Sequence, residues 1–279
     1  MKNQLLFLST CLIISFVRTQ EQPVYHVPIH GTIDMGLPYF IQRVVNEAEE
    51  HNAKAIIFDI DTFGGRVDAA TQIKDIILDS KVITIAFINK RAISAGALIS
   101  LSCDSIFMTP GASIGAATAV DLKGNKASEK VISYMREEMA STAEANNRSR
   151  EIATSMVDEE LSIPYFLNIE GDTLTARDVK GFSEGKLITL STNLAVQLGI
   201  SNKEIETYDD LLAHLNLSDA ETFEITETWS EVLVRFLTNP MVAPLFMSLG
   251  MLGLFMEIKS PGFGVPGIFG LICLGLFFG

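Results

Sequence analysis

The carboxyl-terminal end of the chain, residues 236–279, is almost free of charge, and this constrains the fold more than any other feature. Glu257 and Lys259 are its only charged side chains. They separate two apolar stretches, residues 240–256 and 263–279, each near the lower length limit of about 17 residues for a membrane-spanning helix. A buried hairpin of a soluble domain is the alternative. Because this tail has no polar face to present to water, we expect a transmembrane hairpin.

The amino-terminal end is the second apolar segment. An apolar run over residues 5–17 lies between Lys2 and a polar sequence that begins at Arg18, which is the pattern of a secretory signal. We therefore expect a signal peptide over residues 1–20, with a retained membrane anchor as the alternative. The domain that follows would lie on the extracytoplasmic side of the cell membrane, and the protein would be multi-pass.

An acidic domain of ordinary composition lies between these two ends. The whole chain has a formal net charge of -13; because Lys2 and Arg18 are positive and the tail is neutral, residues 21–235 carry -15. Such a domain lacks the basic surface that nucleic acids require, so we expect no nucleic-acid partner. Cys103 is its only cysteine, which excludes an intradomain disulfide. No spacing typical of a metal site occurs, and we expect neither metal nor cofactor.

Strand-like and helix-like patterns alternate from residue 24 onward. Short apolar or β-branched runs predict strands at 24–33, 53–59, 82–88 and 105–108. Apolar residues near a 3.6-residue period, or runs of small residues, predict helices at 37–51, 67–78, 94–101 and 129–146. This alternation predicts an α/β fold with a mostly parallel sheet, whose strand-end loops would carry the chemistry.

Two of these loops contain candidate functional groups. Residues 61–67 include Gly64 and Gly65, whose backbone N–H groups can approach an anion because no Cβ blocks them. Residues 90–97 place Ser94 at the start of a helix of small residues, where its hydroxyl could meet a substrate beside free helix amides. The alternatives are a structural turn for the glycines and a helix N-cap for the serine.

A serine nucleophile needs a base, and the histidines are poorly placed to provide one. None lies within residues 52–213; the four histidines are His26, His30, His51 and His214. A lysine can serve instead if burial lowers its pKa enough for the neutral amine to accept the serine proton. Lys123, Lys126 and Lys130 lie just before or within the long helix expected at 129–146. Lys126 and Lys130 would share a helix face if that helix began early.

Several motifs in a fixed order resemble those of the NfeD family of membrane-bound ClpP-class serine proteases. They are Thr62–Gly65, Ala92–Gly96, Ala112–Ala116, Tyr134–Arg136 and Ala143–Arg148. The resemblance extends over residues 24–279 and includes the hydrophobic tail. It implies a ClpP/crotonase-like domain of repeated β-α units at 21–230, followed by the membrane hairpin at 231–279. It also implies a Ser–Lys dyad that cleaves apolar segments of stomatin-like membrane proteins.

The resemblance also implies which residues form the dyad. Ser94 matches the family serine. The family lysine lies ten residues before the basic residue of the Tyr134–Arg136 motif, which gives Lys126, with Lys130 as the alternative if a local gap intervenes.

The oxyanion hole implied by the resemblance consists of backbone N–H groups. The donors would be those of Gly65 and Ala95, with Gly64 and Gly96 as supporting loop residues. Phe63 departs from the pattern, since many relatives have proline there, and this affects the geometry expected of the loop; Asn147, where many have glycine, is a second departure.

The expected protein is therefore a membrane-anchored serine endopeptidase that acts on a peptide or protein substrate and forms a homo-oligomer, a dimer or larger. Two alternatives remain open. One is a crotonase-type acyl-CoA enzyme, which would use the same oxyanion hole without a nucleophile. The other is a non-catalytic membrane scaffold for stomatin-like partners. Long family members carry an OB-fold domain after the membrane helices, so the chain is expected to be a short or truncated form.

Overall fold

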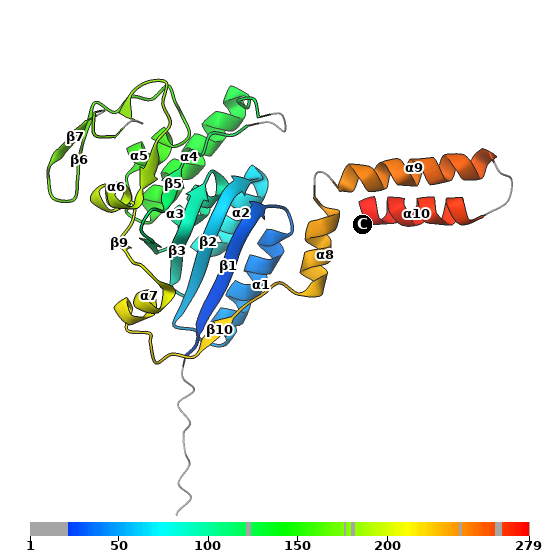
Figure 1. The fold of residues 1–279 in the computed structure, drawn as a ribbon, viewed down its shortest axis with the longest axis horizontal. Coiled ribbons are helices and arrows are strands. Elements are labelled where there is room, and N and C mark those ends of the chain that lie inside the picture. The colour runs from blue at the N-terminus through cyan, green and yellow to red at the C-terminus, as the bar shows by residue number, and fades with distance from the viewer. Residues whose placement is uncertain are drawn as a thin grey trace, which may run out of the picture.

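The structure is a computed structural model of the chain. It describes residues 22–120, 124–175, 177–179, 182–239, 242–259 and 264–278. The signal peptide expected at residues 1–20 lies outside this described part. Figure 1 shows a domain built around a twisted sheet, from which a helical arm extends on one side.

Parallel strands form the centre of the domain. Their order across the sheet is β10-β1-β2-β3-β4-β9. They are β1 (Val24–Ile33), β2 (Ala55–Gly65), β3 (Thr84–Ile93), β4 (Ser105–Met108), β9 (Lys203–Glu204) and β10 (Thr222–Glu224). Beyond β4, β5 (Ser113–Gly115) pairs with the end of β3, and β8 (Thr189–Ser191) pairs antiparallel with β5. A separate antiparallel pair is formed by β6 (Tyr165–Leu167) and β7 (Thr173–Thr175).

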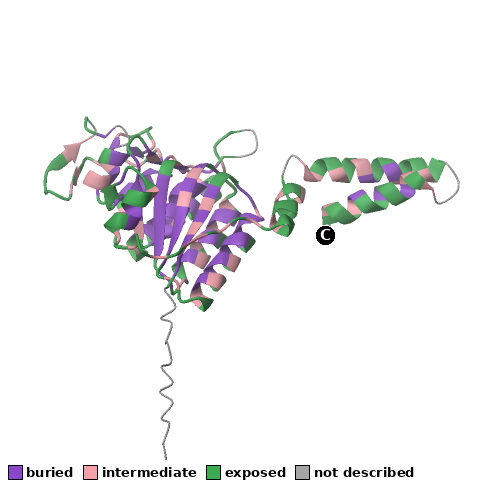
Figure 2. Cartoon of the chain, turned by 60° about the horizontal axis from the view of Figure 1, so that its bottom comes forward, coloured by how far each residue is buried: buried purple, intermediate pink, exposed green. Residues whose placement is uncertain are grey.

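Helices cover both faces of this sheet. They are α1 (Leu37–Glu50), α2 (Val67–Leu78), α3 (Ala95–Ser102), α4 (Glu129–Ala145), α5 (Arg150–Ser155), α6 (Thr192–Gln197) and α7 (Tyr208–His214). Alternate residues of one strand point to opposite faces, so Phe58 belongs to the larger core with α1 to α4, whereas Ile57 belongs to a smaller core closed by α7. Figure 2 shows the strands buried between these layers. The α/β fold with a mostly parallel sheet is confirmed.

The central strands are longer than their apolar runs predicted. β2 continues to Gly65 instead of ending at residue 59, and β3 continues to Ile93 instead of residue 88. The extensions contain polar residues such as Asp61 and Lys90, so hydropathy alone does not mark them as strand. The register between the two strands shifts after Ile60. This irregularity sets the path of both strand ends, which carry the predicted functional loops.

The carboxyl-terminal arm consists of α8 (Trp229–Leu237), α9 (Ala243–Lys259) and α10 (Val265–Phe278). The two long helices form an antiparallel hairpin with close backbone contact. A Cβ added to Gly253 would lie 2.8 Å from the Cα of Gly270. Glu257 accepts hydrogen bonds from the N–H groups of Gly264 (2.7 Å) and Gly267 (3.2 Å), so it stabilises the start of α10. Among the described helices, none has both the length and the apolar character needed to cross a bilayer.

Candidate active site

Ser94 occupies a strained turn between β3 and α3. Its backbone angles are φ 56° and ψ -118°, outside the left-handed well that non-glycine residues ordinarily use. Its N–H donates to the carbonyl of Gly115 at 2.9 Å, which holds the turn against β5. The Ser94 side chain makes no capping hydrogen bond to α3. Ser94 therefore occupies the N-cap position of α3 without capping the helix through its hydroxyl, and the residue is half-buried.

Backbone from the other predicted loop lies directly against this serine. A Cβ added to Gly64, whose φ is 105°, would lie 2.6 Å from the Cβ of Ser94 and 3.1 Å from its Oγ. A Cβ added to Gly96 would lie 2.5 Å from Cγ2 of Thr62, so α3 packs closely on β2. The structure thus brings together two loops that lie 30 residues apart in the chain, and both supporting glycines are needed for close approach.

Thr62, which the sequence pattern did not single out as a site residue, positions the glycine pair. Its Oγ1 accepts a hydrogen bond from the Gly64 N–H at 2.9 Å, and its hydroxyl also contacts the carbonyl of Gly31. Arg66, two residues after Gly64, donates its backbone N–H to the carbonyl of Ile33 in β1 at 2.8 Å. Because successive amides of an extended strand point to opposite sides, the intervening Gly65 N–H is directed away from β1.

Helix α3 begins beside the Ser94 hydroxyl, and an arginine from outside the helix holds its far end. Ala95 is the first residue of α3, and the amides of a helix's first turn have no partner within the helix. At the other end of α3, the buried Arg148 donates to the carbonyls of Leu101 (3.0 Å), Cys103 (2.9 Å) and Asp104 (3.2 Å). Arg148 therefore fixes the helix whose start carries Ser94. Its place in the Ala143–Arg148 motif was the only sequence signal for this role.

The predicted lysines are not joined to the serine in this structure. Lys126 Nζ donates to Glu159 Oε1 at 2.9 Å and lies 3.9 Å from Glu160 Oε1. The hydrogen bond to Glu159 raises the pKa of Lys126, which favours the charged form. Lys130 is exposed in the first turn of α4. Lys123 lies outside the described residues. The contacts of Lys126 in the described residues are thus with Glu159 and Glu160, and the expected Ser–Lys pair is not formed.

The four histidines all interact with other groups. The contacts are His26 with Glu224 (2.6 Å), His30 with Asp59 (3.5 Å), His51 with Tyr25 (2.5 Å) and His214 with Lys203 (3.5 Å). None of these contacts involves Ser94.

A cleft of about 460 Å³ lies beside the serine turn and is lined in part by Ile93 and Phe63. Phe63 is 74% exposed, and the guanidinium carbon of Arg91 lies 4.4 Å from its ring centroid. Arg91 Nε is in turn 3.0 Å from Asp61 Oδ1. Phe63 therefore stacks with Arg91 at the rim of the cleft, and Gly64 after it lies against Ser94.

Two family models match most of the chain. Residues 23–225 match the NfeD1b N-terminal domain, and residues 241–279 match the NfeD integral membrane domain. The membrane protein NfeD1b of Bacillus subtilis is 36% identical over 261 residues, which is 94% of this chain and 56% of that protein. The membrane-bound protease PH1510 of Pyrococcus horikoshii is 28% identical over 261 residues, 90% of this chain and 56% of that protein. The chain thus spans about half the length of these curated relatives.

Solved structures share the fold of the domain. One is 1510-N, a membrane-bound stomatin-specific protease, solved as a lysine-to-alanine mutant in complex with a substrate peptide. It aligns with a TM-score of 0.62 and 24% identity over 78% of this chain and 99% of that chain. A serine-to-alanine mutant of 1510-N aligns with a TM-score of 0.60 and 24% identity over 75% of this chain and 99% of that chain. Because the NfeD1b domain model alone covers well over half of the sequence, the chain belongs to the NfeD family.

Proposed function

We propose that this chain is a membrane-anchored serine endopeptidase of the ClpP class, with Ser94 as its nucleophile. The observation that carries the proposal is the strained turn at Ser94, whose hydroxyl is uncapped and lies against the backbone of Gly64. A serine kept in an unfavourable conformation without any capping bond is typical of a functional position. The name of the PH1510 relative, a membrane-bound protease, supports the same activity.

In the proposed reaction, Ser94 Oγ attacks the carbonyl carbon of a peptide bond. The base takes the hydroxyl proton and later donates it to the departing amine as the C–N bond breaks, which leaves an acyl-enzyme that water hydrolyses. The backbone N–H groups of Gly65 and Ala95 would stabilise the negative charge that develops on the carbonyl oxygen. The orientation of the Gly65 amide and the free first-turn amide of α3 support this assignment.

Lys126 is the proposed base, with Lys130 as the alternative. For Lys126 to accept a proton it must be neutral, so the hydrogen bond that holds it to Glu159 has to open during catalysis. Opening would leave the amine free to turn toward Ser94, and cover by a bound substrate would lower its pKa by desolvation. The lysine mutant of 1510-N, solved with a substrate peptide, supports a functional lysine in this fold.

The proposed substrate is an apolar segment of a stomatin-like membrane protein. The support is the name of 1510-N, a stomatin-specific protease, together with the match of residues 241–279 to an integral membrane domain. In this proposal the α9–α10 hairpin anchors the protein as a multi-pass membrane protein with the protease domain on the extracytoplasmic side. A homo-oligomer, a dimer or larger, completes the proposed assembly.

Labelling with a serine-reactive fluorophosphonate tests the nucleophile. The full chain in detergent micelles should form one adduct, and peptide mapping should assign it to Ser94. The Ser94→Ala variant should remain folded and lose both the adduct and cleavage of an apolar peptide. Retained cleavage by this variant would exclude Ser94 as the nucleophile. Absence of any adduct in the folded chain would favour the crotonase-type enzyme or the non-catalytic scaffold.

A pair of lysine variants tests the base. Lys126→Ala and Lys130→Ala remove exposed side chains, so both variants should fold as the parent does. Only the variant that lacks the true base should lose the acylation burst. Loss of the burst in Lys130→Ala alone would transfer the role to Lys130, and a normal burst in both would refute the dyad.

A further inference from the structure

Helix α8 presents its apolar face to the outside of the molecule. Trp229, Val232, Leu233 and Phe236 follow the i, i+3, i+4, i+7 spacing of one helical face. All four side chains are exposed, and Trp229 is 80% exposed. A helix of a soluble domain ordinarily turns such a stripe toward the core, whereas here all four side chains stay largely exposed within the described chain, with one ring contact from Phe236 to α9.

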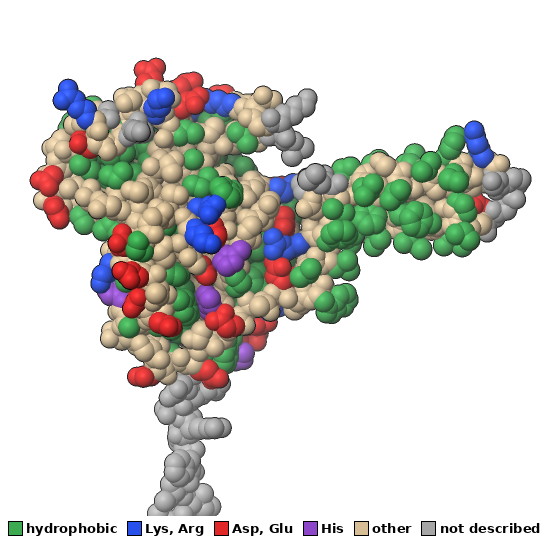
Figure 3. Space-filling view, viewed as in Figure 1, with side chains coloured by type: hydrophobic (Ala, Val, Ile, Leu, Met, Phe, Trp, Pro, Cys, Tyr) green, Lys and Arg blue, Asp and Glu red, His purple; other side chains and the backbone are tan. Residues whose placement is uncertain are grey.

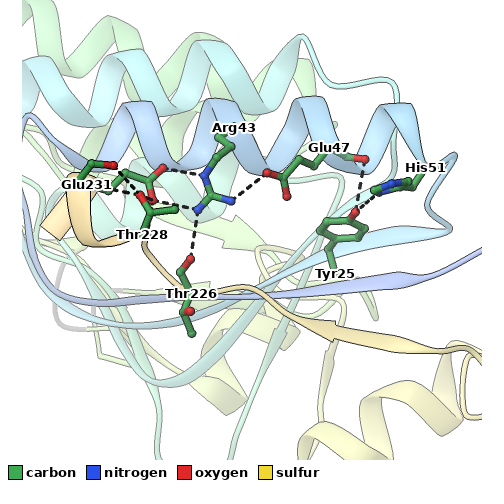
Figure 4. A network of polar contacts seen from close by, with 8 residues as sticks. Tyr25, Arg43, Glu47, His51, Thr226, Thr228 and Glu231 are labelled. Carbon is green, nitrogen blue, oxygen red and sulfur yellow. Dashed lines mark hydrogen bonds and ion pairs between the residues drawn. The ribbon is translucent and has the colours of Figure 1, made fainter.

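The opposite, polar face of α8 is attached to the protease domain by partly buried ion pairs. Glu231 Oε1 accepts from Arg43 Nε at 2.7 Å and Glu231 Oε2 accepts from Arg43 Nη2 at 2.9 Å, a two-pronged pair shown in Figure 4. The same arginine donates to the carbonyl of Thr226 at 3.1 Å. Hydrogen bonds from Arg43 lower the pKa of Glu231 and so favour its charged form. Glu231 also closes a capping box with Thr228 at the start of α8.

A second pair lies one turn further along the same face. Arg235 Nε donates to Asp34 Oδ2 at 2.8 Å, and Arg235 Nη2 donates to the carbonyl of Thr32 at 3.1 Å. The backbone of Gly36 approaches so closely that an added Cβ would lie 2.4 Å from Cγ of Arg235. Two arginine–carboxylate pairs thus fix the rotation of α8 about its axis, and the apolar stripe cannot turn inward without breaking them.

The position of α8 in the chain indicates what covers this stripe. The helix lies between the two family matches, which end at residue 225 and begin at residue 241. Phe236 contacts Phe246 of α9, with ring centroids 6.4 Å apart. In Figure 1, α8 runs across the direction of the α9–α10 hairpin. If the hairpin stands in a bilayer, a helix that crosses it at this end lies along the bilayer surface. Figure 3 shows that the hairpin is covered with apolar side chains up to this corner.

We propose that α8 is an interfacial helix that lies in the headgroup region of the membrane, with its apolar stripe toward the lipid chains and its ion pairs toward the protease domain. The proposal rests on membrane insertion of the hairpin, as proposed above. Amphipathic helices of this kind sink about 5–10 Å into the interface, and tryptophan prefers this depth. The helix would hold the protease domain in one orientation on the membrane.

Trp229 is the only tryptophan of the chain, so its fluorescence reports on α8 alone. The full chain is reconstituted into phosphatidylcholine–phosphatidylglycerol vesicles whose acyl chains are brominated either near the headgroup or near the bilayer centre. We expect a blue-shifted emission, loss of most of it with shallow bromine and much less loss with deep bromine. Acrylamide in the water should quench it weakly.

Two results would overturn the inference. Emission that acrylamide quenches and bromine does not would place Trp229 in water. Emission that neither agent quenches would mean that protein, such as a second copy of the chain, covers the stripe. Flotation of the same vesicles after carbonate extraction separates this inference from the insertion on which it rests. A chain that does not float refutes insertion of the hairpin, whereas a chain that floats with unquenched Trp229 refutes only the interfacial helix.

A matched variant controls for the position of the probe. The Trp229→Phe/Tyr165→Trp double variant moves the fluorophore to Tyr165 in β6, which is 61% exposed and lies on the side of the domain away from the arm in Figure 1. Its emission should be quenched by acrylamide and unaffected by either bromine position. The Val232→Glu variant should retain the ion pairs and flotation but lose most of the shallow-bromine quenching at Trp229. Unchanged quenching in this variant would refute contact between the stripe and lipid.

Discussion

Replacing Ser94 by glycine should stabilise the protein while it abolishes the proposed activity. The positive φ of Ser94, 56° with ψ -118°, is a conformation that glycine adopts freely and that a Cβ makes unfavourable. Ser94→Ala is the matched control because it removes the same hydroxyl and keeps the Cβ. The comparison of the two variants therefore isolates the backbone strain.

The expected size of the effect follows from two opposing contributions. Relief of one strained backbone conformation is worth about 1–3 kcal/mol. Glycine also makes the unfolded chain more flexible, which costs about 0.4–1 kcal/mol. The net gain should be about 1 kcal/mol, which raises the melting temperature by about 2–4 °C in a domain of this size. Ser94→Ala should change stability by less than about 0.5 kcal/mol because the hydroxyl makes no capping hydrogen bond that could be lost.

The measurement is thermal unfolding of the full chain in detergent micelles, followed by circular dichroism at several scan rates. Fluorophosphonate labelling is measured on the same samples. Ser94→Gly should melt above both the parent and Ser94→Ala, and neither variant should be labelled. If Ser94→Gly melts at or below the temperature of Ser94→Ala, the turn stores no strain, and the structural argument for a functional serine fails.

Three further predictions concern the surroundings of this turn. Gly64→Ala and Gly171→Ala both place a Cβ at positive φ (105° and 88°), a backbone cost of about 1–2 kcal/mol each. The added Cβ meets open space at Gly171 but would lie 2.6 Å from the Ser94 Cβ at Gly64, so Gly64→Ala should cost more and should alone lose fluorophosphonate labelling. Equal labelling of the two folded variants would contradict the contact. Arg148→Met removes the arginine donor from the carbonyls of Cys103 and Asp104 and leaves that of Leu101 with Asn146 alone, so it should cost about 2–3 kcal/mol in urea unfolding. A loss below about 1 kcal/mol would show that the arginine does not secure α3. Glu159→Gln removes the main cause of the raised pKa of Lys126. A lower lysine pKa leaves more neutral amine at any given pH, so the acid limb of the pH profile of peptide cleavage should move to lower pH. An unmoved limb would show that Lys126 is not the base.

The sequence was sufficient to predict the fold because the information lies in local patterns. The short apolar run at 53–59 predicted a buried strand, which β2 contains from Ala55 onward, and the helix predicted at 67–78 has those bounds in the structure. Both candidate loops were also found from sequence, since a serine before small residues and a glycine pair after a strand are local signals. Their meeting at Ser94 and Gly64 depends on the polar extensions of β2 and β3 and on the register shift after Ile60, which no local pattern encodes.

The hydrogen-bond partner of Lys126 also could not be predicted from the sequence. Lys126 and Glu159 lie 33 residues apart, and their hydrogen bond depends on how the segment after α5 folds back toward the start of α4. The sequence identified Lys126 as the candidate base, whereas the structure showed that Glu159 accepts its hydrogen bond. A charged side chain on a loop can pair with any nearby surface group, so its partner follows from packing and not from spacing.

By itself, the sequence determined the order of strands and helices, the acidic domain and the uncharged tail, because hydrophobic burial follows the periodicity of the chain. It expected the tail to begin at residue 231, within α8. Only the tertiary structure decided the rotation of that helix, through the pairs of Glu231 with Arg43 and of Arg235 with Asp34. The stripe of apolar residues is visible in the sequence. Whether it faces a core or the outside depends on where the charged residues on the opposite side of α8 find their partners.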